Sequence, residues 1–318
     1  EFRGYNHNLR IGDGENWDEE NLTSDFYPVF SPRKARGYYA TPASPQGLIA
    51  KDKLCYVDGE NFVYGSQVIA LGLSTAAEDC PKKLVSMGAY VCVFPDKKYV
   101  NTADLTDFGS MEAAYTSTGT VTFTMCTSDG TDMENVTVSG TAPESPVNGQ
   151  YWLDTSGSPS VLKKWTVTTA VWVTIQTTYV KIASDGIGTG FAVGDGVTLA
   201  GITAESLGDL NGSALIYGQG DNYLVVVGVL GNQVTQATPV TVKRSVPNMD
   251  FVTESGNRLW GCRYGTAVNG QTVNEIYACK LGDFKNWNVY SGISTDAYTA
   301  SVGSDGPFTG AVTHLGYP

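Results

Sequence analysis

The stretch NRLWGCRYGTAVNGQTVNEIYACKLGDFKNW, residues 257–287, contains two strand-like runs separated by a turn, with two cysteines and two tryptophans. Three interpretations are open at this point: a redox or metal site, a sugar-binding surface, or one unit of a structural repeat. The choice depends on whether the same order of strands and turns recurs elsewhere in the chain.

The order of short strands and tight turns does recur. Residues 47–73 read as four strands, with Asp58-Gly59 as a hairpin signal. Residues 82–102 repeat the pattern with apolar side chains at alternate positions, and it resumes from residue 249 with a Gly256-Asn257 turn. We expect a partial fourth unit in residues 297–317.

Units of about 40 residues with three or four short strands are typical of propeller blades, which bury their faces only by stacking on the next blade. The opening stretch is therefore interpreted as a blade. Its tryptophans, Trp260 and Trp287, are expected to pack between blades.

The composition also favours strands over helices. The 318 residues include 37 glycines, and long runs of Leu, Glu, Lys and Ala are lacking. No run approaches the roughly 18 apolar residues that span a bilayer, so no membrane contact is expected. We predict an all-β protein with β-propeller-like blades, interrupted by an inserted small β domain.

Four parts can be delimited along the chain. Residues 1–45 are predicted to form an extended arm, 46–105 the first blades, 106–246 the inserted β domain, and 247–318 the continued, truncated blades. The chain stops after a strand-like run without a closing turn, so we expect it to be a piece of a longer protein. The large side chains of the arm are predicted to contact another subunit: Trp17, Phe26, Tyr27 and Phe30.

The inserted part contains a compact set of predicted hairpins, residues 142–176, with three tryptophans at Trp152, Trp165 and Trp172. Their spacing is consistent with one shared small core. Sugar-binding modules, however, stack pyranose rings on exposed aromatic side chains. A glycan-stacking surface at these three residues therefore stays open as an alternative.

Catalytic residues are not expected in this chain. The two histidines, His7 and His314, lie far from any nucleophile motif, which argues against Ser-His-Asp and Cys-His schemes. Carboxylates are plentiful, and a glycosidase pair is the remaining alternative. Most of them stand in Gly or Asn turns, where their side chains bond the local backbone.

Two Gly-rich or acidic segments resemble ligand loops only superficially. Residues 184–196 lead into a strand, whereas a phosphate loop needs a helix N-terminus. Residues 12–21 are acidic but lack the ligand alternation and central glycine of a calcium loop. We therefore expect no metal site and no cofactor.

The six cysteines show no two-residue spacing of the kind found in zinc and redox motifs. Most are expected to be free and buried, since a thiol in an apolar strand behaves as a small hydrophobic group. A cross-strand disulfide between Cys262 and Cys279 is the alternative.

The net charge of −12 argues against a protein that holds nucleic acid electrostatically, because such proteins need Lys and Arg to displace counterions from phosphates. The exception is the local cluster of Arg33, Lys34 and Arg36. No sequence-specific nucleic-acid binding is expected.

The arm, residues 2–37, and the blade, residues 257–310, resemble virion proteins of tailed phages and prophages, called packaged-DNA stabilisation or tail nozzle proteins. Residues 142–165 are similar to small β modules that recur in phage structural proteins. The resemblance implies a β-propeller that assembles as a ring, typically a hexamer, below the portal and forms the channel through which DNA leaves.

On this basis the expected function is structural: a part of the tail nozzle or head-tail conduit that retains and passes DNA. The implied partners are copies of itself and adjacent portal and tail proteins, and the implied location is the virion tail, after production in the bacterial cytoplasm. The alternatives are a glycan-binding β module in host-surface adhesion and a propeller enzyme.

Overall fold

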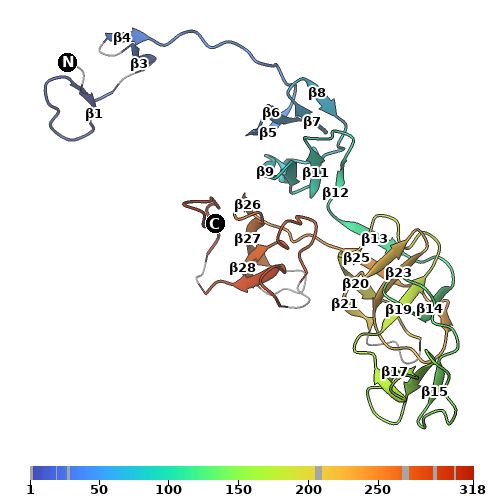
Figure 1. Cartoon of the computed structure of the whole chain (residues 1–318). Helices are drawn as coiled ribbons and strands as arrows, with labels where there is room; N and C mark the ends of the chain where they lie inside the picture. The colour runs from blue at the N-terminus through green and yellow to red at the C-terminus, as the bar shows by residue number, and fades with distance from the viewer. Residues whose placement is uncertain are drawn as a thin grey trace. The chain divides into compact units, whose positions relative to one another are not determined.

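The computed structural model describes residues 3–18, 20–26, 29–204, 210–266, 272–288, 292–303 and 306–318 (Figure 1). The chain divides into two compact units, Glu1–Ala43 and Ser44–Pro318, which are described separately.

The first unit contains two small sheets. Strand β1 (Gly4–Tyr5) pairs in parallel with β2 (Glu15–Asn16), and β3 (Leu22–Phe26) pairs antiparallel with β4 (Val29–Pro32). Residues 33–43 follow without strand or helix. None of the side chains described in this unit is buried.

The second unit begins with an antiparallel meander of four strands in chain order. These strands are β5 (Pro45–Ala50), β6 (Leu54–Asp58), β7 (Asn61–Tyr64) and β8 (Gln67–Ile69). The predicted turn after Asp58 is confirmed, and Gly59 has a φ of +58°, which glycine adopts without steric cost.

A second meander follows after a single 3-10 turn at Ala77–Asp79. Its strands are β9 (Lys83–Met87), β10 (Tyr90–Phe94), β11 (Lys98–Asn101) and β12 (Phe108–Ser110). Because β12 pairs with β11, the boundary between this meander and the inserted part lies after Ser110, not at residue 105.

The third meander is made by β26 (Phe251–Glu254), β27 (Leu259–Thr266), β28 (Thr272–Ala278) and β29 (Tyr298–Ser301). The Gly256-Asn257 turn is confirmed, with positive φ at both residues. Strand β29 pairs with β28, so it completes the third meander instead of starting a fourth unit. In residues 306–318 the structure shows only an isolated bridge between His314 and Tyr317.

The three meanders stack face to face. In β10, Val91 and Val93 belong to the core shared with the first meander, whereas Cys92 and Phe94 belong to the core shared with the third. Successive side chains of a strand point to opposite faces, so the middle sheet is covered on both sides. Trp287 lies in the core between the second and third meanders, as predicted, but Trp260 does not.

Between the second and third meanders the chain forms two further sheets. One contains β13 (Ala113–Thr116), β25 (Thr241–Arg244), β20 (Gly196–Ala200) and β21 (Gly212–Leu215). The other contains β22 (Gly218–Gly220), β23 (Tyr223–Val227), β19 (Tyr179–Ala183), β14 (Val121–Cys126) and β24 (Val234–Gln236). Side chains from both sheets share one core, as in a β-sandwich.

A small sheet, here called the tryptophan sheet, is inserted between β14 and β19. It consists of β15 (Thr137–Ser139), β16 (Tyr151–Asp154), β17 (Val161–Thr166) and β18 (Val171–Thr174). Leu153 and Leu162 pack with Met125 of the sandwich in a separate small core.

The protein is therefore all-β, as the composition predicts. Within the part of the chain that the structure describes, no helix is long and apolar enough to cross a membrane. Whether residues 106–246 fold as a separable domain stays a prediction.

Candidate functional site

The three tryptophans of the inserted part lie on neighbouring strands of the tryptophan sheet. Trp165 pairs directly with Trp172, and Trp152 pairs with Lys163. Paired residues share a face, so all three indoles lie on the same face of the sheet. The core residues, Leu153 and Leu162, lie on the opposite face.

The indole rings pack on one another. The ring centroids of Trp152 and Trp172 are 5.3 Å apart in an edge-on arrangement, and those of Trp165 and Trp172 are 5.4 Å apart with a tilt of 59°. Trp152 is only 6% exposed, whereas Trp165 and Trp172 are half-buried. The structure thus brings the three predicted residues together as one aromatic cluster.

An ion pair borders this cluster. Lys163 lies 4.7 Å from the centroid of the Trp152 ring and forms a salt bridge of 2.8 Å with Asp154. The hydrogen bond from Lys163, together with those from Ser156, lowers the pKa of Asp154 to about 2. The indole Nε1 of Trp152 donates to the carbonyl of Ser139 at 2.9 Å.

This geometry limits what the cluster can bind. A pyranose ring needs a free aromatic face. The Trp152 ring is covered by Lys163 and by the edge of Trp172, so a flat platform of three rings is not present. Trp165 and Trp172 remain partly exposed and are the rings that a sugar could reach.

An open groove of about 670 Å³ lies beside the same sheet and is lined by Glu134, Asn135, Asn148, Gln150 and Tyr151, among others. Its amides hold the local backbone: the Gln150 side chain accepts from the Val147 N–H at 3.0 Å, and Asn148 accepts from the Val167 N–H at 3.1 Å. These two amide oxygens therefore stabilise the local loops.

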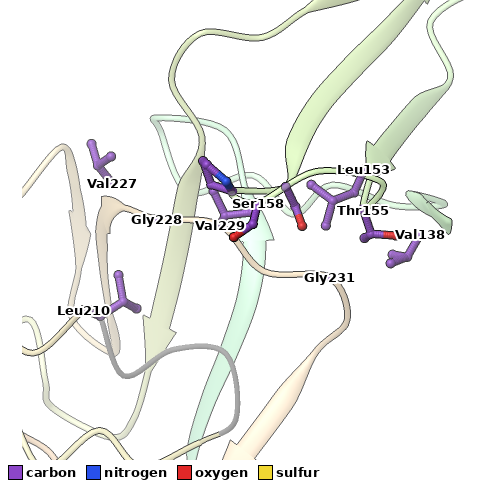
Figure 2. A pocket seen from close by; sticks show the side chains of 11 residues that line it. Val138, Leu153, Thr155, Ser158, Leu210, Val227, Gly228, Val229 and Gly231 are labelled. Carbon is purple, nitrogen blue, oxygen red and sulfur yellow. The ribbon is translucent and has the colours of Figure 1, made fainter. Parts of the chain in front are cut away.

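A cavity of about 540 Å³ lies beside this small core and is lined from both the tryptophan sheet and the sandwich (Figure 2). Val138, Leu153 and Thr155 line it from the small sheet, and Leu210 and Val227 line it from the sandwich. Its lining includes no ionisable side chain among the residues described. It therefore offers space for apolar contact but no group for acid-base chemistry.

The structure describes the side chains of two of the four predicted contact residues of the arm. Trp17 is 48% exposed and stacks on His7 with a centroid distance of 4.7 Å, and Phe26 is 60% exposed. Tyr27 and the side chain of Phe30 lie outside the described residues. The subunit contact stays a prediction.

The basic cluster lies in the extended segment that ends the first unit. Arg33, Lys34 and Arg36 are exposed, and Tyr38, two residues further on, is 93% exposed. The guanidinium of Arg33 donates to the Asn21 side chain at 3.3 Å. This segment offers both charge and aromatic surface to a partner.

Carboxylates in turns bond to their neighbours in the chain, as predicted. Asp129 accepts from the Thr127 hydroxyl and from the Thr131 N–H, and these bonds lower its pKa. Glu15, in the acidic segment of the arm, accepts from the Gly12 N–H at 2.6 Å. Among the described residues no group of three His, Cys, Asp or Glu side chains is placed to hold a metal ion.

One buried polar junction was not predicted from the sequence. Asp195, expected only to cap a turn, forms an ion pair with Arg244 of the sandwich, and both side chains are buried. Asn286, in the loop after β28, donates to Asp195 at 3.3 Å and accepts from the Gly196 N–H at 2.6 Å. Arg244 Nε also donates to the carbonyl of Met111 at 3.1 Å.

This junction ties the sandwich to the third meander and to the end of the second. Its members are far apart in the chain, so no local spacing reveals them. The sequence contains one hint of the junction: Arg244 is the single arginine between residues 106 and 246. Arginine is the cation best suited to a buried pair with additional carbonyl acceptors.

All six cysteines are free. Cys262 pairs with Ile276 on one face of the third meander, whereas Cys279 belongs to the core on the other face. The alternative of a Cys262–Cys279 disulfide is therefore wrong. Burial raises the pKa of Cys279 and of Cys126 to about 12, so these thiols are unreactive in the folded chain.

Comparison of this chain with protein-family models, with curated proteins and with solved structures finds no match.

Proposed function

We propose that this chain is a structural protein of a tailed-phage virion, in which the stacked meanders form part of a β-propeller wall around the path of the DNA. The observation that carries the proposal is the stack of three four-stranded antiparallel meanders. Propeller blades bury their apolar faces in the same manner. The resemblance of the arm and of residues 257–310 to tail nozzle proteins supplies the virion context.

The charge distribution supports a conduit for DNA. The chain has a net charge of −12, and several cations are already paired with carboxylates: Lys82 with Asp96, Lys97 with Glu112, Lys163 with Asp154, Lys181 with Asp132 and Arg244 with Asp195. Each phosphate contact adds a salt-sensitive binding term, which would slow a DNA molecule that has to move.

A gel-shift titration with duplex DNA at about 150 mM salt tests this proposal. We expect no shift at micromolar protein. The variant with Arg33→Gln, Lys34→Gln and Arg36→Gln serves as the matched control, because any binding at low salt should come from this cluster and vanish with it. Micromolar or tighter binding at the higher salt concentration contradicts the conduit.

The proposal places copies of the chain in a ring, a hexamer by the resemblance, next to portal and tail proteins of the virion. Immunogold electron microscopy of phage particles checks this location. Label at the head-tail junction or tail is the expected result, and label absent from purified particles contradicts it.

Glycan binding is a second candidate, favoured by the partly exposed rings of Trp165 and Trp172 on the outer face of the tryptophan sheet. If it is correct, a glycan panel gives a saturable signal that is lost in Trp165→Ala. Val173→Ala, an exposed position on the adjacent strand, should leave that signal unchanged. No saturable signal with the unmodified chain refutes it.

A further inference from the structure

Residues 33–43 end the first unit as an extended segment without strand or helix (Figure 1). Every side chain from Pro32 to Thr41 is exposed, and Tyr38 is 93% exposed. No hydrogen bond joins residues 34–42 to any other residue that the structure describes. Another protein can therefore bind this stretch of backbone without opening a sheet.

A protease needs a segment of this kind. Proteolytic cleavage occurs preferentially where the backbone is exposed and makes no hydrogen bonds, because a bond inside a sheet is accessible only after local unfolding. Lys164 and Lys243 are exposed too, but β17 and β25, which contain them, are paired with a neighbouring strand on both sides. Exposure of a basic side chain alone therefore does not make a cleavage site.

The segment also has the side chains that one class of protease selects. Arg33, Lys34 and Arg36 precede Gly37 in the sequence. Serine proteases of trypsin-like specificity place an aspartate in the pocket for the residue before the cleaved bond, and this carboxylate binds Lys or Arg. Among the residues that the structure describes, none of the three cations forms a salt bridge, so each is free to bind an external carboxylate.

Arg36–Gly37 is the most accessible of the three bonds that follow these cations. The N–H of Arg33 donates to the Asn21 carbonyl at 2.7 Å, and its guanidinium donates to the Asn21 side chain at 3.3 Å. The bonds after Arg33 and Lys34 therefore lie next to a residue that is held to the arm. At Gly37, by contrast, an added Cβ would meet no heavy atom within 4 Å.

Arg10 is another exposed arginine of the first unit, but it lies in a closed loop. Strands β1 and β2 pair on either side of it. The N–H of Arg3 donates to the Gly14 carbonyl at 2.6 Å, and a second bond of 2.9 Å joins Asn6 to Asn16. A protease would have to break this pairing before the loop could bind as an extended chain.

We propose that the Arg36–Gly37 bond is a processing site for a serine protease of trypsin-like specificity. The reaction adds one water across the amide bond, which leaves a carboxylate on Arg36 and a free amino group on Gly37. The cut detaches residues 1–36 with the exposed Trp17 and Phe26. It leaves every strand of the second unit intact, because the first of them begins at Pro45. Contacts made by the arm can thus be removed without unfolding the second unit.

Limited digestion of the whole chain with trypsin, followed by intact-mass spectrometry, tests this proposal. We expect residues 1–36 and 37–318 as the first products, with a circular dichroism melting curve like that of the uncut chain. Arg36→Gln removes the charge that the pocket binds, whereas Gly37→Pro keeps the charge but removes the N–H and fixes φ. Each should slow the cut at this bond at least about tenfold. Arg10→Gln is the matched control and should be cut at the rate of the unmodified chain.

Chymotrypsin separates accessibility from charge, because the exposed Tyr38 and Tyr39 lie in the same segment. It should cut there equally fast in the unmodified chain and in Arg36→Gln, and resistance to it would overturn the proposal. A first tryptic cut at Arg10, at Lys34 or within residues 44–318 would also overturn it. So would a cut chain that no longer melts cooperatively. No DNA enters this test, so it can fail while the gel-shift result still holds.

Discussion

The second meander and the tryptophan sheet both contain four strands, but they are buried in different ways. Strand β10 has four consecutive buried residues, Val91 to Phe94, because a neighbouring sheet covers each face. In β16 to β18 one face packs on a small core through Leu153 and Leu162, and the other is covered mainly by its own tryptophans. The first arrangement makes a rigid stack, and the second leaves aromatic surface accessible.

The comparison shows how a strand pattern should be interpreted. A continuous apolar run such as that of β10 indicates a sheet between two others. Alternation that includes large aromatic residues indicates a sheet with one covered face. Accessible chemistry is therefore expected at the tryptophan sheet, and resistance to unfolding at the meanders.

The largest effect is expected in the second meander. Phe94→Ala removes a fully buried ring between two sheets and should lower the free energy of unfolding by about 3–5 kcal/mol. Urea denaturation followed by circular dichroism measures this value. Phe108→Ala, an exposed phenylalanine of the same meander, is the control and should cost far less. Equal losses in the two variants would contradict burial on both faces.

The second-largest loss of stability is expected at the buried junction of Asp195, Arg244 and Asn286. Asp195→Ala leaves the guanidinium of Arg244 buried without its carboxylate, at a cost of about 3 kcal/mol. The double variant Asp195→Ala and Arg244→Met should recover part of this loss in the same denaturation assay, because no charge then remains buried. A double variant less stable than the single one would argue against the pair.

A smaller and local effect is expected in the tryptophan sheet. Trp172→Ala removes the ring that contacts both Trp152 and Trp165 and should cost about 1–2 kcal/mol, since the side chain is only half-buried. Hydrogen exchange should accelerate in residues 137–174 and stay unchanged in the meanders. Acceleration in all three meanders would show that the two regions are not independent.

The smallest effect concerns the acid side of the pH range. The pKa of Asp154 is lowered to about 2, so its contribution to stability is complete above pH 4 and is lost as the pH falls towards 2. Asp154→Asn lacks this contribution at every pH. The difference in hydrogen exchange of β16 and β17 between the two chains should therefore shrink from pH 4 to pH 2. A constant difference would contradict the assignment.

A structural feature can be predicted from the sequence when the residues that determine it are close together in the chain. The turns at Asp58-Gly59 and Gly256-Asn257 were predicted because turn chemistry is local. The assignment of Tyr298–Ser301 was wrong because a loop of 19 residues separates β29 from its partner β28 and hides the pairing. Two strands that pair across such a long loop show no sign of the pairing in their local sequence.

The candidate sites also differ in how far they could be predicted from the sequence. The clustering of Trp152, Trp165 and Trp172 was predicted from their spacing on adjacent strands. The exposure of these tryptophans could not be predicted, because it depends on what covers the outer face of the sheet. The Asp195–Arg244 pair joins segments 49 residues apart and was visible only as an isolated arginine.

The central claim is that the three meanders stack face to face. Methyl NOE spectroscopy of the deuterated chain, with labelled Ile, Leu, Val and Met methyl groups, tests it most directly. We predict cross-peaks from Val91, Val93 or Val100 to methyl groups of the first meander, and from Val85 or Met87 to Leu259 or Met249 beside the third. Cross-peaks confined within each meander, with none between them, would contradict the account.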